Sequence, residues 1–304
     1  MDFFTSIFLN TNKEWRAGWK TAFFIMLVII LTFPVAFLLK LLPAEYQQIP
    51  FAMLISVPLA SWIVLRYVDQ KPLKTIGLLT GDGAKVILVD CLFGLVSGAA
   101  AMGIIALLIV FYGGSFEMNS SLLTEKVIGF FMLMIAVGIT EEMQVRGYML
   151  RVISDGFRFG SMSIKQGFWA AAIFTSIIFG LLHFFNPNTS FVSTLNISLA
   201  GILLVWPIAV TGRMYGAFAL HFSWNWFQGG LFGFPVSGQA IENSIYVYTM
   251  PENATFFSGG AFGPEAGIVG LIGMIIAALP FWFIYIRQNR TLRIFETQFE
   301  QIKD

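Results

Sequence analysis

Residues 86–112 read VILVDCLFGLVSGAAAMGIIALLIVFY, an apolar run that carries a single charged side chain, Asp90. A second run, residues 23–39, carries none. A helix that crosses a bilayer needs about 20 mainly apolar residues. Only helices and closed barrels satisfy every backbone polar group in lipid, and a barrel would show short alternating segments instead. The sequence therefore predicts an all-α protein that crosses the membrane several times, a polytopic membrane helix bundle.

The overall composition supports a membrane location. Hydrophobic residues make up 57% of the chain and charged residues 12%, whereas about 25% of the residues in soluble domains are charged. The net charge is +1, and the basic residues are spread between apolar runs, so they form no patch for nucleic acid. We expect the lipid bilayer as surroundings, a membrane-associated peptide or protein as partner, and no nucleic acid.

Apolar runs between charged or Pro-, Gly- and Asn-rich breaks predict about eight transmembrane helices in one integral membrane domain, residues 1–304. The helices are expected near residues 19–42, 50–68, 85–112, 126–150, 166–185, 190–211, 214–233 and 264–287. With this count, all but two of the 18 Lys and Arg residues fall on one side of the membrane. Because such residues concentrate in cytoplasmic loops, we predict that both termini are cytoplasmic. We expect the protein to lie in the plasma membrane.

The predicted fourth helix contains the acidic pair of GITEEMQVRG, residues 138–147. An ionisable group inside a membrane helix costs a few kcal/mol on insertion scales, so it needs a partner or a function. Glu142 and Arg146 are four residues apart and can pair on one helix face, whereas Glu141 points about 100° away. We expect Glu142 and Arg146 to support a site in which Glu141 is free. Asp90 is expected to be solvated near the membrane surface.

The chain has two histidines, and both lie in predicted membrane helices. His183 ends the fifth helix, while His221 and Asn225 lie one turn apart on the seventh. A single histidine in an apolar helix is usually a core residue whose ring nitrogens are hydrogen-bonded within the protein. Two histidines together with a free intramembrane glutamate instead indicate one shared polar pocket.

These residues permit two schemes of hydrolysis. In the first, Glu141 is the general base for a water that His183 also holds, and His221 and Asn225 stabilise the oxyanion. In the second, Glu141, His183 and His221 bind a divalent metal such as zinc, which activates the water and leaves Glu142 or no residue as the base. We favour the metal-free scheme, although the sequence permits both.

Three motifs together resemble the CPBP intramembrane proteases, a family that includes the type II CAAX prenyl endopeptidases and bacteriocin-processing proteins. Two glutamates, three residues and an arginine correspond to Glu141, Glu142 and Arg146. Phenylalanine, three residues and histidine correspond to Phe179 and His183. Histidine, three residues and asparagine correspond to His221 and Asn225.

The resemblance implies peptide-bond hydrolysis among membrane helices, with the first glutamate as the base and a catalytic core at about residues 126–233. It does not imply prenylated substrates. Val145 stands where the family often has an aromatic residue before the motif arginine, which puts substrate contacts in doubt.

Two other functions stay open, and one geometric difficulty remains. Intramembrane Glu, Arg and His also serve proton-coupled transporters, although no inverted repeat is visible. A non-catalytic scaffold or immunity protein could retain the same fold. In straight helices, Glu141 and His221 would lie in the cytoplasmic half of the bilayer and His183 nearer the outer face. The site therefore requires helices that tilt or stagger.

Overall fold

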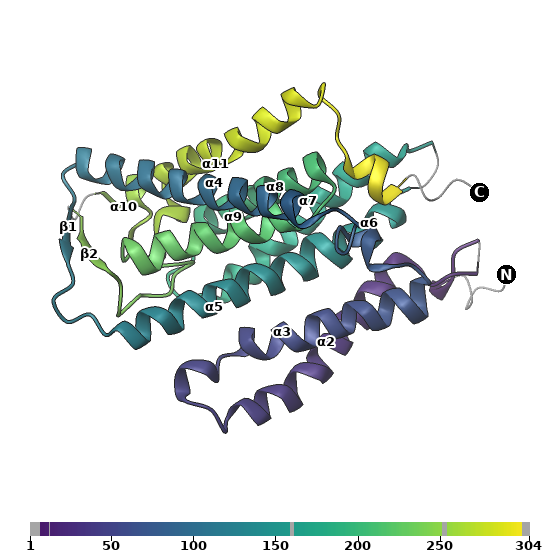
Figure 1. Cartoon of the computed structure of the whole chain (residues 1–304), viewed down its shortest axis with the longest axis horizontal. Coiled ribbons are helices and arrows are strands. Elements are labelled where there is room, and N and C mark those ends of the chain that lie inside the picture. Colours follow the sequence, from purple (N-terminus) through teal and green to yellow (C-terminus); the bar gives the residue numbers. More distant parts are fainter. Residues whose placement is uncertain (1–6, 12, 159–160, 251–253, 300–304) are drawn as a thin grey trace.

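The computed structural model describes residues 7–11, 13–158, 161–250 and 254–299 and shows a bundle of long helices (Figure 1). Among these residues, seven helical segments are long and apolar enough to cross a membrane. They are α2 (Ala17–Leu39), α3 with the π-helical η2 (Ile49–Asp69), α4 (Ala84–Phe111), α5 to α6 (Thr124–Gly156), α7 with η5 (Ile164–Phe185), α8 (Phe191–Thr211) and α11 (Ile268–Arg287). The predicted polytopic helix bundle is confirmed.

The helix predicted at residues 214–233 is present but shorter than the other seven. It consists of α9 (Tyr215–Asn225), continued by the π-helical turn η6 (Trp226–Leu231). The helix lies within the bundle and packs against α4, α5 and α8 (Figure 1). The count of about eight therefore includes seven full-length spans and one shorter interior helix.

The predicted fourth helix is longer than the sequence suggested. Instead of ending near residue 150, it runs through α5 (Thr124–Glu142), the π-helical η4 (Met143–Met149) and α6 (Leu150–Gly156). Its Arg146 and Arg151 are 2% and 3% exposed, so neither is a surface-loop charge. As a consequence, Glu141 lies near the middle of a 33-residue helical segment and not close to one end.

Glycines bring α9 against its neighbours. A Cβ atom at Gly98 of α4 would lie 2.6 Å from the backbone nitrogen of Trp224, and one at Gly138 of α5 would lie 3.0 Å from that of Phe222. Real Cβ atoms essentially never lie closer than 3.0 Å to another heavy atom, so the approach at Gly98 requires glycine, and a larger residue at Gly138 would require its neighbour to move. The helix that carries His221 is thereby held close to the helix that carries the two glutamates.

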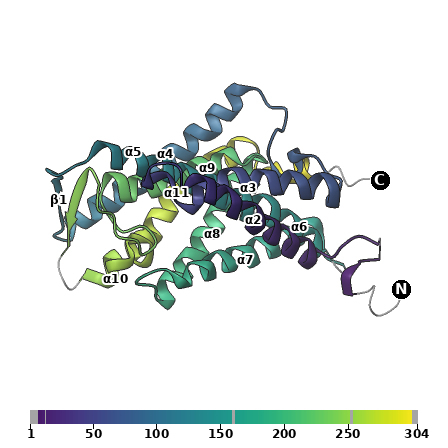
Figure 2. The same cartoon turned by 90° about the horizontal axis from the view of Figure 1, so that it is seen from below.

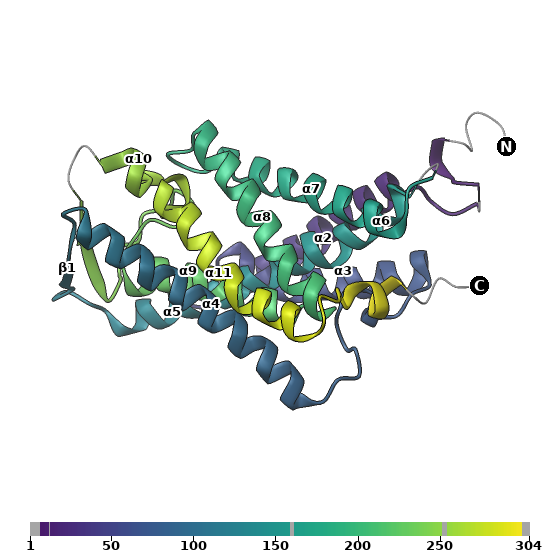
Figure 3. The same ribbon diagram turned by 90° about the horizontal axis from the view of Figure 1, so that it is seen from above.

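The two ends of the bundle differ. At one end, here the sheet end, β1 (Ser115–Met118) pairs antiparallel with β2 (Tyr246–Thr249). The described ends of the chain, including η10 (Phe295–Phe299), lie at the opposite end of the bundle, which we call the terminal end (Figure 1). Figures 2 and 3 show α7 beside α8 on one side of the bundle and α4 beside α11 on another. The remaining short segments are η1 (Ala44–Tyr46), η3 (Leu73–Ile76), α10 (Thr255–Ser258), η8 (Gly260–Phe262) and η9 (Pro264–Ala266).

The expectation of a solvated Asp90 is wrong. Asp90 is 2% exposed and accepts hydrogen bonds from Arg213 Nε at 2.5 Å and from its second guanidinium nitrogen at 3.0 Å. Arg213 lies in the short connection between α8 and α9. Although burial alone would lower it, the pKa of Arg213 is raised by Asp90 and Asp82. The pair fixes the beginning of α9 to α4.

Candidate active site

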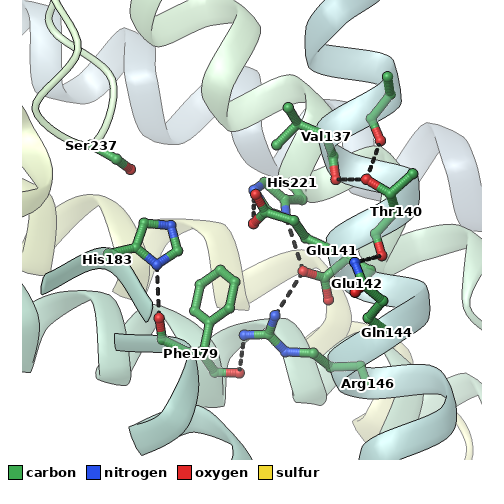
Figure 4. A network of polar contacts seen from close by, with 12 residues as sticks. Val137, Thr140, Glu141, Glu142, Gln144, Arg146, Phe179, His183, His221 and Ser237 are labelled. Carbon is green, nitrogen blue, oxygen red and sulfur yellow. Dashed lines mark hydrogen bonds and ion pairs between the residues drawn. The ribbon is translucent and has the colours of Figure 1, made fainter. Parts of the chain in front are cut away.

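Glu142, Arg146 and His221 form one buried polar network (Figure 4). Glu142 Oε1 accepts hydrogen bonds from Arg146 at 2.9 Å and from His221 Nδ1 at 2.8 Å. Arg146 also donates to the carbonyl oxygen of Gly201 on α8, at 3.3 Å. The expected Glu142–Arg146 pair is thus present, and it joins three helices, because His221 comes from α9.

Glu141 is the less constrained of the two glutamates. Its Oε2 atom is shielded from solvent, has no hydrogen-bond partner and lies 4.0 Å from His221 Nε2. That separation is too long for a direct hydrogen bond. A water molecule beside both atoms would satisfy the buried oxygen. Glu141 is therefore the carboxylate that is available for chemistry, while Glu142 is committed to Arg146 and His221.

Phe179 links the two histidines. Its ring centroid lies 4.7 Å from that of His183 and 6.2 Å from that of His221, and the guanidinium carbon of Arg146 lies 4.0 Å from it. His183 Nδ1 is 2.7 Å from the carbonyl oxygen of Phe179. Because a carbonyl oxygen only accepts, His183 must donate from Nδ1, which leaves Nε2 as an acceptor in the neutral ring.

Glu141, His183, His221 and Asn225 line a single cavity of about 240 Å³. Asn225 is 6% exposed and makes no side-chain hydrogen bond with another described residue, so its amide is free to bind a ligand. The structure bears on the expected difference in depth in two ways. Glu141 lies mid-helix, and Glu141 and His183 both line this one cavity. No hydrogen bond or ion pair between described residues joins His183 to Glu141.

The cavity wall includes residues that sequence reasoning missed. The loop between α9 and α11 supplies Val236, Ser237, Gln239 and Glu265, and the segment after His183 supplies Asn186. This loop is therefore part of the cavity wall. A single acidic residue in a Gly- and Pro-containing loop gives no periodic signal, so helical spacing assigned Glu265 no role in the site.

The residues do not assemble the zinc site that the sequence permits. Among the described residues, no three His, Cys, Asp or Glu side chains are close enough together to hold a metal ion. Glu141, His183 and His221 share a cavity wall but not a common coordination point. We therefore derive no chemical step through a metal.

A comparison with known families identifies the segment that carries these residues. Residues 123–227 match the family described as type II CAAX prenyl endopeptidase Rce1-like. The match covers roughly a third of the chain and contains all six predicted site residues. It confirms the resemblance drawn from the three motifs. No curated protein matches the chain.

Proposed function

We propose that the protein, which carries this Rce1-like CAAX protease domain in a multi-pass membrane bundle, is an intramembrane endopeptidase that uses Glu141 to activate water. Its substrate would be a membrane-associated protein or peptide. The observation that carries the proposal is the unpaired, buried Oε2 atom of Glu141, 4.0 Å from His221 Nε2 on the wall of one cavity.

In the proposed reaction, Glu141 removes a proton from a water as the water oxygen adds to the carbonyl carbon of the scissile peptide bond. The carbonyl π electrons move to the oxygen and form a tetrahedral oxyanion. When this intermediate collapses, the bond between carbon and nitrogen breaks, and Glu141 returns the proton to the leaving amine. His183 helps to hold the water, because its Nε2 atom is an acceptor once Nδ1 donates to Phe179.

His221 and Asn225 are the proposed oxyanion donors. Because His221 donates from Nδ1 to Glu142, it can donate from Nε2 only as the imidazolium. Two carboxylates and one guanidinium surround it, so a protonated His221 makes the cluster of Glu141, Glu142, Arg146 and His221 electrically neutral. The free amide of Asn225 adds a second donor on the same helix face.

The test is cleavage of a diverse membrane-peptide library by the purified protein in liposomes, followed by mass spectrometry. We expect Glu141→Gln to abolish the cuts made by the parent protein. Glu125→Gln is the matched control, because Glu125 lies in the first turn of the same helix and is exposed. The Glu125→Gln variant should cut the same peptides at the same positions as the parent protein.

Cuts that persist in Glu141→Gln would remove Glu141 from its role and point to a contaminating protease. The absence of cuts together with a proton flux dependent on Glu141 would favour a transporter. Inhibition by a chelator with recovery on addition of zinc would favour the metal-assisted scheme over direct activation by Glu141.

A further inference from the structure

Glu265 is a second carboxylate in the wall of the cavity, and the proposed reaction does not use it. It lies in η9, just before α11, and is 4% exposed. It reaches the cavity from the sheet end, whereas Glu141 reaches it from α5. A buried acidic side chain that faces a cavity costs free energy unless it meets a partner.

Within the protein, neutral donors alone bond to the Glu265 carboxylate among the described residues: Ser237 donates the closest hydrogen bonds and the side chain of Gln228 contributes another. The backbone nitrogen of Ser237 is 2.6 Å from Oε2, and its hydroxyl oxygen is 3.2 Å from Oε1 and 3.3 Å from Oε2. These bonds hold the side chain in place on the cavity wall. Asn186 Nδ2 donates to the carbonyl oxygen of Ser237 at 2.9 Å and ties the same turn to the segment after His183.

The Glu265 carboxylate has no ion-pair partner in the part of the chain that the structure describes. Among the described residues, no Lys, Arg or His nitrogen lies within 4.0 Å of Glu265, whereas Glu142 has Arg146 and Asp90 has Arg213. Burial raises the pKa of Glu265; hydrogen bonds from Ser237 and Gln228 and the nearby His183 act in the opposite direction without cancelling this effect. A positive charge in the cavity would therefore remove the cost of ionising it.

The other ionisable groups of the cavity favour the same kind of ligand. Its described lining contains two carboxylates, Glu141 and Glu265, and two histidines, but no Lys or Arg. A peptide C-terminal carboxylate near Glu265 would be repelled, whereas an ammonium or guanidinium group would be attracted. Much of the remaining wall is apolar, including Leu133, Leu204 and Trp224, and suits the neighbouring side chains of a membrane peptide.

We propose that Glu265 is a specificity-determining residue that binds a lysine or arginine side chain of the peptide substrate at the sheet end of the cavity. This inference rests on the proposed peptidase function only in that the ligand is a peptide. It concerns binding and not the hydrolytic step, so it can be tested in a protein that does not cleave.

The experiment measures binding of fluorescent apolar membrane peptides to the full-length Glu141→Gln protein in liposomes. The peptides form a scanning set in which one position carries either lysine or norleucine. We expect lysine at one position to bind about tenfold or more tightly than norleucine, because a bond to a charged group is lost with norleucine. Adding Glu265→Gln should remove this preference, and Glu265→Asp should retain part of it.

Glu242→Gln is the matched control for the change of charge. Glu242 lies in the same loop, is exposed and does not line the cavity. The preference for lysine should survive this change. Equal affinities for lysine and norleucine at every position would overturn the proposal. So would a Glu265→Gln variant that weakens both peptides by the same factor, because that result describes a carboxylate which only holds the loop through Ser237.

The library experiment separates this proposal from the proposed function. A lysine preference that depends on Glu265, together with cleavage that does not depend on Glu141, would support the binding role and reject the catalytic one. Cleavage that depends on Glu141 but has no preference for basic residues would do the reverse.

Discussion

At the residue scale, the two adjacent glutamates have different surroundings and should respond differently to the same substitution. Glu142→Gln leaves the buried Arg146 without its counter-ion. Breaking a buried pair by removing one partner costs about 3 to 5 kcal/mol. We expect Glu142→Gln to lower the free energy of unfolding by an amount of that order and to reduce activity, because an amide oxygen can still accept from His221 Nδ1 but no longer stabilises the imidazolium.

Glu141→Gln should abolish activity with a smaller loss of stability than Glu142→Gln, because Oε2 accepts no hydrogen bond within the protein and lies 4.0 Å from His221 Nε2. Denaturation of both variants in detergent micelles, measured beside peptide cleavage, checks the contrast. Equal destabilisation by the two substitutions would show that Glu141 is as much a structural residue as Glu142.

Helical spacing accounts for what could be predicted at this scale. An interval of four residues was enough to pair Glu142 with Arg146 and to leave Glu141 free. The bond from Glu142 to His221 joins residues 79 positions apart and depends on how α5 and α9 pack, which spacing within one helix does not determine. Phe179 entered through a motif, but its contacts with Arg146 and both histidines required the fold.

At the element scale, small residues decide how closely the helices approach. Gly98→Ala would place a methyl group 2.6 Å from the backbone nitrogen of Trp224 and 2.7 Å from Ser223 Cβ. Because backbone cannot rotate away as a side chain can, α9 must shift. We expect a destabilisation of about 1 to 3 kcal/mol, together with a loss of activity as His221 moves.

Gly103→Ala, in the same helix, is the control for this prediction, because a Cβ atom there would meet nothing within 4 Å. It should leave stability and cleavage near parental values. Thermal unfolding and peptide cleavage of both variants provide the comparison. If Gly98→Ala behaved like Gly103→Ala, the approach of α4 and α9 would not be what positions the site.

Helix positions followed from the sequence better than helix lengths did. Apolar runs indicated every long helix among the described residues. The π-helical turns η4 and η6 follow directly after Glu142 and Asn225 and were not foreseen. Such turns often occur at functional sites, but they arise from tertiary packing and have no residue signature.

At the scale of the whole molecule, the distribution of Lys and Arg residues indicates how the protein is oriented in the membrane. Lys40 and Lys126 are the two basic residues that the predicted helix count places on the outer side. Lys40 directly follows α2, and Lys126 lies in the first turn of α5. The burial of Arg146 and Arg151 removes two charges from the count of loop residues. Since the other basic residues still favour one side, we propose that the terminal end is cytoplasmic. Met1 and Asp304 themselves lie outside the described residues.

Cysteine labelling tests this orientation in a parent that carries Cys91→Ala, because Cys91 is the only native cysteine. Gly83→Cys lies at the start of α4, where an added Cβ meets open space, and Ser120→Cys is exposed between β1 and α5. In intact cells, a membrane-impermeant maleimide should label Ser120→Cys and spare Gly83→Cys, and inside-out vesicles should reverse the result. The opposite pattern would invert the protein and place the Glu265 side of the cavity toward the cytoplasm, so that the basic residue of the substrate would enter from within the cell.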